Sequence, residues 1–205
     1  MDVLRERNLV DGLTGLYNRK YLDEFIDKKM PHELTKGMTY AVMFLDIDYF
    51  KMVNDTYGHE AGDVILSTVG KILRKYIRQV DFAGRYGGEE FLLVLPQMEK
   101  FNAFERAEQL RAAMASTPVT YGVSRIAVTA SFGVATYPLD GKTRDALINA
   151  ADRALYAAKA AGRLSFGLIR STADFGDHEA IRAAGREARA HGFDGATCIH
   201  PALVP

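Results

Sequence analysis

The stretch Phe82–Leu95 reads FAGRYGGEEFLLVL and contains two β-prone runs on either side of Gly87-Gly88. Two such runs separated by a pair of glycines predict a β-hairpin. We expect the glycines to allow a tight turn with positive φ and to let a ligand approach the backbone closely. Glu89 and Glu90 then stand at the start of a buried strand, where unpaired carboxylates are costly unless a cation is present. An ordinary solvated hairpin tip is the alternative interpretation.

Along the whole chain, hydrophobic periodicity predicts alternating helices and strands, the two strands of the hairpin included. Apolar residues at helical spacing indicate amphipathic helices, and short apolar runs indicate buried strands. The predicted helices are Asn18–Met30, Ala61–Arg78, Ala103–Ala115 and Arg144–Ala161, and the predicted strands are Tyr40–Asp46, Phe82–Tyr86, Glu89–Leu95 and Ile126–Tyr137. An antiparallel hairpin combined with crossover helices predicts an α+β fold in which helices cover a mixed central sheet.

Composition and charge limit the class of protein. The chain has 205 residues, of which 48% are hydrophobic and 25% charged, values typical of one globular domain with or without an appendage. The 26 basic and 26 acidic residues balance, which argues against a general nucleic-acid binder but not against a phosphate-bearing small molecule. A single cysteine, Cys198, excludes an internal disulfide. With charges near the N-terminus and no apolar run of about 18 residues, we expect a cytoplasmic protein without a membrane partner.

A second acidic motif is FLDIDYFKMVND, Phe44–Asp55. Asp46 directly follows an apolar run, so it is a better candidate than Asp48 for a divalent-cation ligand beside bound phosphates. Mg²⁺ favours one or two carboxylates together with phosphate oxygens. Taken alone, the motif is better explained by acids that cap the following turn or helix. Paired with the acidic hairpin, it favours a cation site.

The motif GGEEF at Gly87–Phe91 resembles the signature loop of the GGDEF family, the diguanylate cyclases. Further matches follow the family's order: DGLTGLYNR (Asp11–Arg19), DIDYFKMVNDTYGHEAGD (Asp46–Asp63) and AADRALYAAKAAGR (Ala150–Arg163). Members of this family condense two GTP into cyclic di-GMP and release two pyrophosphates. The resemblance implies a ferredoxin-like palm similar to that of nucleotidyl cyclases and polymerases.

The resemblance also implies a metal site. Asp46, the carbonyl of Ile47 and Glu89 would hold two Mg²⁺ ions per active site, with Mn²⁺ as a possible substitute and Glu90 close by. Such ions neutralise the triphosphate and activate the 3′-hydroxyl for in-line attack on the α-phosphorus. The group that accepts the hydroxyl proton stays open between Glu90 and a metal-bound water.

Five further residues match the family's nucleotide-binding positions. Lys51, Lys159 and Arg163 would contact the phosphates, and Asn54 and Asp63 would bind guanine. A carboxylate accepts hydrogen bonds from the N1–H and amino groups of guanine, whereas adenine presents an acceptor at N1. The alternatives are solvated cations on helices and, for Asp63, an acid that complements a helix N-terminus.

Arg78 and Asp81 form an RxxD motif upstream of Gly87. In the family this spacing marks an inhibitory site for the product, cyclic di-GMP. An arginine can bind phosphate with two hydrogen bonds and stack on a purine. The alternative is a local ion pair between residues i and i+3 at a helix end.

The resemblance implies a homodimer, because the product contains two guanylate units and one domain holds one GTP. A catalytically silent domain that binds GTP or cyclic di-GMP as a receptor is the competing function. The presence of the signature acids and the phosphate-binding cations favours the enzyme.

We divide the chain into the end of an N-terminal linker helix (1–10), a cyclase domain (11–170) and an appended fragment (171–205). Composition changes after Arg163, since residues 164–205 contain neither tyrosine nor lysine. Glu187–Pro205 resembles the C-terminal portion of the citrate lyase β-subunit and related acyl-CoA lyases. A (β/α)₈ barrel needs about 200 residues or more, so we expect the fragment to be non-catalytic.

Overall fold

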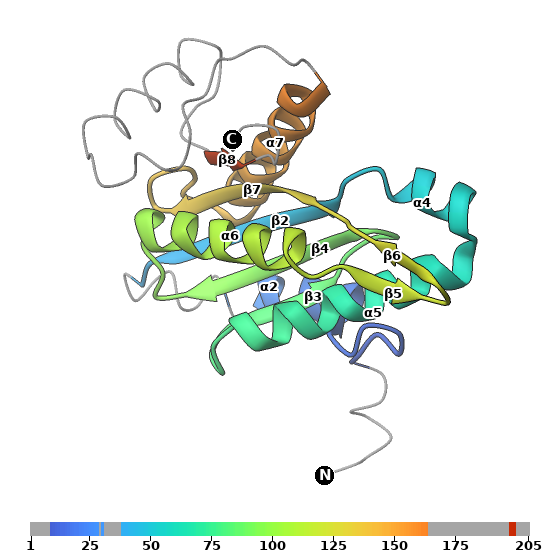
Figure 1. Ribbon diagram of the computed structural model, residues 1–205. Helices are drawn as coiled ribbons and strands as arrows, with labels where there is room; N and C mark the ends of the chain where they lie inside the picture. Colours follow the sequence, from blue (N-terminus) through green and yellow to red (C-terminus); the bar gives the residue numbers. More distant parts are fainter. Residues whose placement is uncertain (1–8, 29, 31–37, 164–196, 200–205) are drawn as a thin grey trace.

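The computed structural model describes residues 9–28, 30, 38–163 and 197–199. This part of the chain forms a six-stranded mixed sheet with helices on both faces, together with a separate two-stranded hairpin (Figure 1). The helices are α2 (Arg19–Lys28), α4 (Phe50–Tyr57), α5 (His59–Tyr76), α6 (Lys100–Ala115) and α7 (Arg144–Arg163). The strands are β1 (Tyr17–Asn18), β2 (Tyr40–Ile47), β3 (Phe82–Arg85), β4 (Glu90–Pro96), β5 (Val119–Tyr121), β6 (Ser124–Ile126), β7 (Ala130–Tyr137) and β8 (Thr197–Ile199).

Strand β2 is the centre of the sheet, whose order is β1-β3-β4-β2-β7-β8. It runs antiparallel to both β4 and β7, and every one of its residues is buried. The register places Asp46 of β2 opposite Glu90 of β4 on one side and Ser131 of β7 on the other. β3 and β4 pair antiparallel, which confirms the hairpin predicted around Gly87-Gly88.

The alternating side chains of β2 separate two hydrophobic cores. Met43 and Leu45 pack with residues of α4, α5 and α6, whereas Val42 and Phe44 pack with residues of α2 and α7. By the same alternation, Asp46 belongs to the face that α7 covers. Figure 1 shows the C-terminal end of α7 and helix α4 on the same side of the molecule, where β2 ends.

The helices and strands predicted within the described residues are present, with ends that differ by a few residues. The single strand predicted at Ile126–Tyr137 is wrong. β6 ends at Ile126, β7 begins at Ala130, and the residues between them belong to neither ladder. At this break the backbone N–H of Asp48 donates to the carbonyl of Thr129 over 2.9 Å. This bond follows the β2–β7 register by one residue beyond the end of the ladder.

Periodicity did not predict α4 or the β5–β6 hairpin. α4 has eight residues and buries only Phe50 and Val53, too few for a recognisable helical repeat. β5 and β6 have three residues each, joined by a turn with Gly122 at a φ of 58°. The sequence after Arg163 predicts a strand at Phe166–Arg170 and a helix at His178–His191, and both segments lie outside the described residues.

The edge of the sheet beside β7 is formed by β8. Its three residues, Thr197–Ile199, pair antiparallel with Phe132–Val134. A short piece of the appended fragment is therefore part of the sheet.

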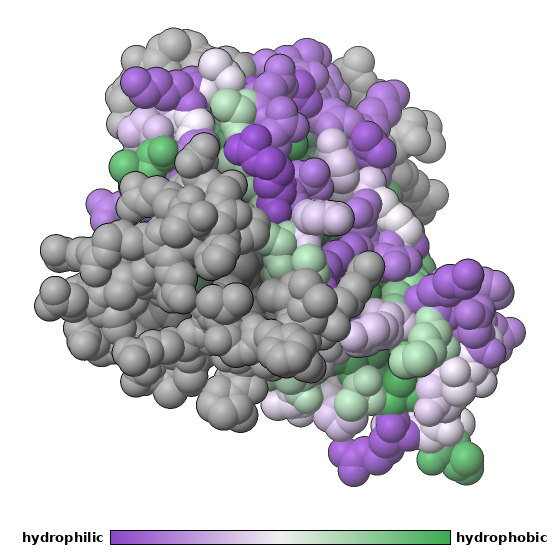
Figure 2. Space-filling model, turned by 90° about the horizontal axis from the view of Figure 1, so that it is seen from above, coloured by the Kyte–Doolittle hydropathy of each residue, from purple (hydrophilic) through white to green (hydrophobic). Residues whose placement is uncertain are grey.

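No described helix is both long enough and apolar enough to cross a membrane. Figure 2 shows hydrophilic residues spread over the described surface seen from above, with hydrophobic residues in small groups between them.

Candidate active site

Three carboxylates come together where β2 ends. Asp46 is the penultimate residue of β2 and is buried. Glu90 lies opposite it in the ladder, and the backbone N–H of Ile47 donates to the carbonyl of Glu89 over 3.3 Å. Glu89 and Glu90 are both half-buried. The antiparallel register thus brings together the two acidic motifs, as their pairing in one cation site requires.

Asp46 contacts a cation from the other end of the chain. The Nζ atom of Lys159, on α7, lies 2.6 Å from its Oδ2 atom. Burial is the largest of the effects that raise the pKa of Asp46 to about 6; the charges of Glu89 and Glu90 act in the same direction, and Lys159 opposes them. One lysine therefore does not compensate the three acids, and the ionised form of Asp46 is electrostatically costly.

This excess of negative charge fits a metal ion. Within the part of the chain that the structure describes, no group of three or more His, Cys, Asp and Glu side chains forms a complete metal cluster. Mg²⁺ does not need one, because it takes one or two carboxylates and completes its coordination with phosphate oxygens and water. Asp46, Glu89 and the carbonyl of Ile47 are oxygen donors of the required kind.

The signature loop differs from our expectation in its backbone. Neither Gly87 nor Gly88 has a positive φ. The turn is held instead by the backbone N–H groups of Tyr86 and Gly87, which both donate to the carbonyl of Glu90 over 2.8 and 3.2 Å. A Cβ atom at Gly87 would collide with the Glu90 carboxylate, whereas one at Gly88 would meet no atom within 4 Å. A side chain at 87 would therefore have to displace the Glu90 carboxylate, and the backbone at 88 is open to a ligand.

An arginine that sequence reasoning did not assign holds this loop. The Nε and Nη2 atoms of Arg85 donate to the carbonyl of Gly88 over 3.1 and 2.7 Å. Its Nη1 atom lies 3.5 Å from Oδ2 of Asp11, in the N-terminal motif. Asp11 also accepts hydrogen bonds from the N–H and the hydroxyl of Thr14, over 2.9 and 2.7 Å. Asp11 lies inside a motif that carried the family resemblance, whereas Arg85 lies in the hairpin, two residues before the motif Gly87–Phe91.

We predict that Asp11→Ala lowers the free energy of unfolding at pH 7 by about 1–2 kcal/mol, because Thr14 loses its acceptor. Burial acts to raise the pKa of Asp11, but the hydrogen bonds from Thr14 and then the charge of Arg85 outweigh it, and the pKa is lowered. The stability that ionised Asp11 contributes is therefore present above pH 3.8, the ordinary pKa of an aspartate. It is lost as the pH falls through the lower pKa of the folded state.

Urea unfolding at pH 7 and at pH 3 measures this difference. The difference in the free energy of unfolding between wild type and Asp11→Ala should be smaller at the lower pH. Asp11→Asn keeps a hydrogen-bond acceptor and should therefore be less destabilised than Asp11→Ala. A gap of equal size at both pH values would contradict the prediction.

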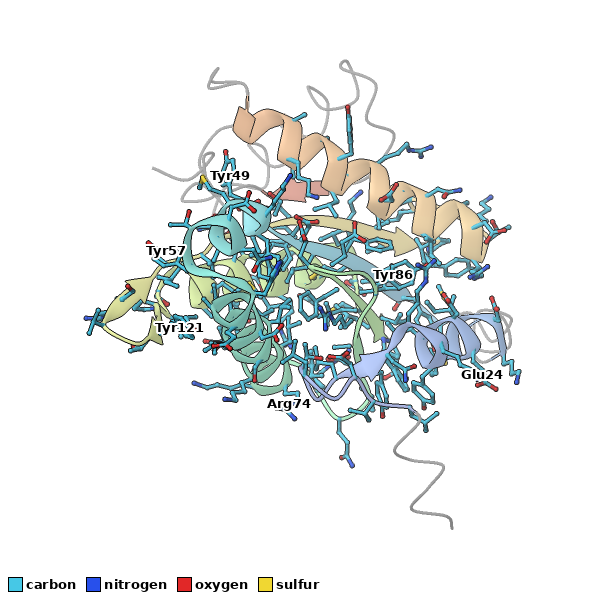
Figure 3. The ribbon with its side chains drawn as sticks, turned by 90° about the vertical axis from the view of Figure 1, so that its right-hand side faces the viewer. Glu24, Tyr49, Tyr57, Arg74, Tyr86 and Tyr121 are labelled. Atoms are coloured by element: carbon cyan, nitrogen blue, oxygen red, sulfur yellow. The ribbon has the colours of Figure 1, made fainter. Side chains whose placement is uncertain are left out.

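The predicted nucleotide-binding residues lie on helices that begin or end near Asp46. Lys51 is exposed at the start of α4 and has no ion pair with any described residue. Asp63 is exposed in the second turn of α5, which is too far into the helix for an acid that complements the helix N-terminus. Arg163 is the last residue of α7, and its side chain lies outside the description. Figure 3 shows Tyr49, directly before α4, near the C-terminal end of α7.

Asn54 stands out among these residues. Its side chain is half-buried, and its Oδ1 atom is buried without a hydrogen-bond donor in the described part of the protein. A buried amide oxygen without a donor is costly, so its presence favours a ligand that supplies one.

Asp48 does not belong to the cluster. Its carboxylate accepts hydrogen bonds from the hydroxyls of Thr129 and Ser131, each over 2.7 Å. It ties the loop after β2 to β7, which agrees with the choice of Asp46 over Asp48 as the candidate ligand.

The RxxD motif forms the local ion pair considered above. The Nη2 atom of Arg78 lies 2.6 Å from Oδ1 of Asp81 and also donates to the carbonyl of Pro96 over 2.7 Å. The Asp81 side chain is fully buried, whereas that of Arg78 is 38% exposed. The exposed part of the guanidinium leaves it accessible to a second partner.

The family model for the diguanylate cyclase GGDEF domain matches residues 8–165. The chain belongs to the GGDEF family of diguanylate cyclases. Among curated GGDEF relatives, the response regulator PleD of Caulobacter vibrioides is 36% identical over 165 residues, which are 80% of this chain and 36% of PleD. Diguanylate cyclase DgcP of Pseudomonas aeruginosa is 39% identical over 159 residues, 78% of this chain and 24% of DgcP. The chain thus spans about a third or less of these relatives.

Solved GGDEF structures share the fold. The GGDEF domain of DgcB from Caulobacter crescentus, in complex with c-di-GMP, is 32% identical with a TM-score of 0.71, covering 79% of this chain and 93% of that domain. Diguanylate cyclase SiaD from Pseudomonas aeruginosa, in complex with its activator SiaC, is 39% identical with a TM-score of 0.72. The match covers 78% of this chain and 61% of the SiaD chain. They confirm the predicted α+β class and the family resemblance of residues 11–163. The lyase resemblance of the tail stays a prediction.

Proposed function

We propose that this chain condenses two GTP into cyclic di-GMP and two pyrophosphates. The observation that carries the proposal is the buried Asp46, which faces Glu89 and Glu90 and, among the described side chains, pairs with one cation, Lys159. Because the negative charge of the three acids is only partly compensated, the site favours a metal-dependent reaction on a nucleotide. Family membership favours the same conclusion.

Asp46, Glu89 and the Ile47 carbonyl would hold two Mg²⁺ ions, or Mn²⁺ in their place. When bound, the metal neutralises the triphosphate and favours ionisation of the attacking 3′-hydroxyl. Glu90 stands opposite Asp46 and is a candidate to accept the hydroxyl proton. Before metal and nucleotide bind, Lys159 partly compensates the charge of Asp46.

The phosphates would be bound by Lys51, Lys159 and Arg163. Lys159 already lies against the acidic cluster, and Lys51 is exposed on the helix that follows β2. Cations at these positions stabilise the charge that develops on the leaving pyrophosphate. Guanine would be recognised by Asn54 and Asp63, since the buried oxygen of Asn54 requires a donor and guanine offers two.

Catalysis by this site requires a homodimer, because each domain holds one GTP. The linker at residues 1–10 and the fragment at residues 171–205 would take no part in the chemistry. The pairing of β8 with β7 supports a structural role for part of the fragment.

Incubation with GTP and Mg²⁺, followed by chromatography, tests the activity. We expect cyclic di-GMP and pyrophosphate, with a rate that rises with the square of the protein concentration at high dilution. A dimeric protein that binds GTP or cyclic di-GMP but forms no product would instead be the receptor considered above.

We further propose that Arg78 and Asp81 form an inhibitory site for cyclic di-GMP. The c-di-GMP complexes of GGDEF relatives make such binding plausible for the family, and Arg78 retains an exposed face.

Arg78→Ala should raise the cyclic di-GMP concentration for half-maximal inhibition at least about tenfold, the loss expected for a charged hydrogen bond. It should also lower the free energy of unfolding by about 1–3 kcal/mol, because Asp81 stays buried with fewer donors. Arg78→Lys should weaken inhibition and stability by smaller amounts. Arg125 is exposed, and Arg125→Ala should change neither inhibition nor stability. Unchanged inhibition of Arg78→Ala would remove the proposed site.

A further inference from the structure

Helices α4 and α5 meet at a glycine corner. Gly58 has a φ of 87° and a ψ of 163°, a conformation that side chains rarely allow. Its N–H donates to the carbonyl of Asn54 over 2.9 Å, and its own carbonyl accepts from the N–H of Gly62 over 3.3 Å. One turn on either side of the corner, Asn54 of α4 and Gly62 of α5 therefore face each other.

Position 62 has no room for a side chain. A Cβ atom there would collide with Oδ1 of Asn54 and would lie 3.1 Å from both Cγ of Asn54 and Cζ of Phe50. Glycine has the lowest helix propensity after proline, so alanine would be the better residue for α5 itself. The contact with Asn54 is the physical reason for glycine at this position.

The same contact determines where the Asn54 amide lies. Gly62 is buried, and the amide oxygen occupies the space that a methyl group would fill. That oxygen has no donor among the described residues. The amide is therefore held in place by packing against Gly62, with its buried oxygen left without a donor from the described residues.

We infer that Gly62 is a positioning residue for nucleobase recognition, which acts by holding the Asn54 amide where it can accept a hydrogen bond from the base. This inference rests on the proposed function, in which that base is guanine. Gly62 itself touches no substrate, and its effect passes through Asn54.

Four proteins test the inference: wild type, Asn54→Ala, Gly62→Ala and the double variant. The probe is 3′-deoxy-GTP with Mg²⁺, which lacks the attacking hydroxyl and so binds without turnover. Each single change should weaken binding about tenfold, the equivalent of one hydrogen bond. The double variant should bind no more weakly than the single variants, because both changes remove the same interaction.

Thermal unfolding supplies a second readout that does not depend on the nucleotide. Gly62→Ala should lower the unfolding temperature in the wild-type background, where the new methyl group meets the amide. In the Asn54→Ala background the same change should lower it much less, because only Cζ of Phe50 stays close to the new methyl group and alanine favours the helix.

Gly70→Ala is the matched control, since it lies in the same helix and its Cβ would collide with the backbone carbonyl of Thr14. It should lower the unfolding temperature without changing the affinity for 3′-deoxy-GTP. If the losses of affinity in Asn54→Ala and Gly62→Ala multiply in the double variant, the two residues act independently. That result would overturn this inference but not the proposed function. A wild type that binds no 3′-deoxy-GTP would overturn the proposed function with it, and the unfolding temperatures would still show whether the contact exists.

Discussion

Glu89→Gln is expected to reduce cyclic di-GMP formation by at least about a hundredfold, the loss typical when one group that stabilises transition-state charge is removed. The substitution keeps the size and hydrogen-bonding capacity of the side chain but removes its charge. It also leaves intact the backbone carbonyl of Glu89, which accepts from Ile47. We therefore expect the fold and its unfolding temperature to be retained.

Product formation from GTP, measured chromatographically for wild type and variant at equal dimer concentration, checks this expectation. Glu105→Gln is the matched control, because Glu105 is an exposed acid on α6. It should not change turnover. If Glu89→Gln forms product at the wild-type rate, Glu89 is not a metal ligand in this protein.

Gly133→Ala is expected to be the most destabilising single substitution, lowering the free energy of unfolding by about 3 kcal/mol or more. A Cβ at this position of β7 would collide with the backbone carbonyl of Ala151 and the backbone N–H of Leu155. Both belong to α7, and a backbone cannot rotate away as a side chain can. The helix would have to move off the sheet, and Lys159 would leave Asp46.

Urea unfolding measures the loss of stability, and Gly12→Ala is the control, since a Cβ at Gly12 would meet no atom within 4 Å. A variant too unstable to purify would agree with the expectation. A Gly133→Ala protein with unchanged stability would show that α7 does not pack this closely on β7.

Much of this fold was predictable because its signals are local. The apolar run Tyr40–Ile47 and the stripe along α5 give their periodicity directly. The elements that periodicity did not predict depend on distant contacts. α4 buries only Phe50 and Val53, and the short strand β5 carries Tyr121, whose hydroxyl donates to Glu60 of α5.

The candidate site divides in the same way. The motifs identified Asp46 and Glu89 as acids of one site, since their residue types and spacing match a family pattern. They did not indicate that Arg85 bonds to the carbonyl of Gly88, because a side chain's backbone partner is not visible in a motif. They also predicted a positive φ for Gly87, whereas the glycine is needed there to leave space for Glu90.

By itself, the sequence determined the fold class and the family, and it predicted the acids and cations of the candidate site. Only the tertiary structure decided which of them meet: the β2–β4 register places Asp46 opposite Glu90, and the packing of α7 on β7 places Lys159 at 2.6 Å from Asp46. The physical reason is that residue identity and periodicity are properties of neighbouring residues. Charge compensation and steric fit, as between Gly62 and Asn54, depend on segments that only folding brings together.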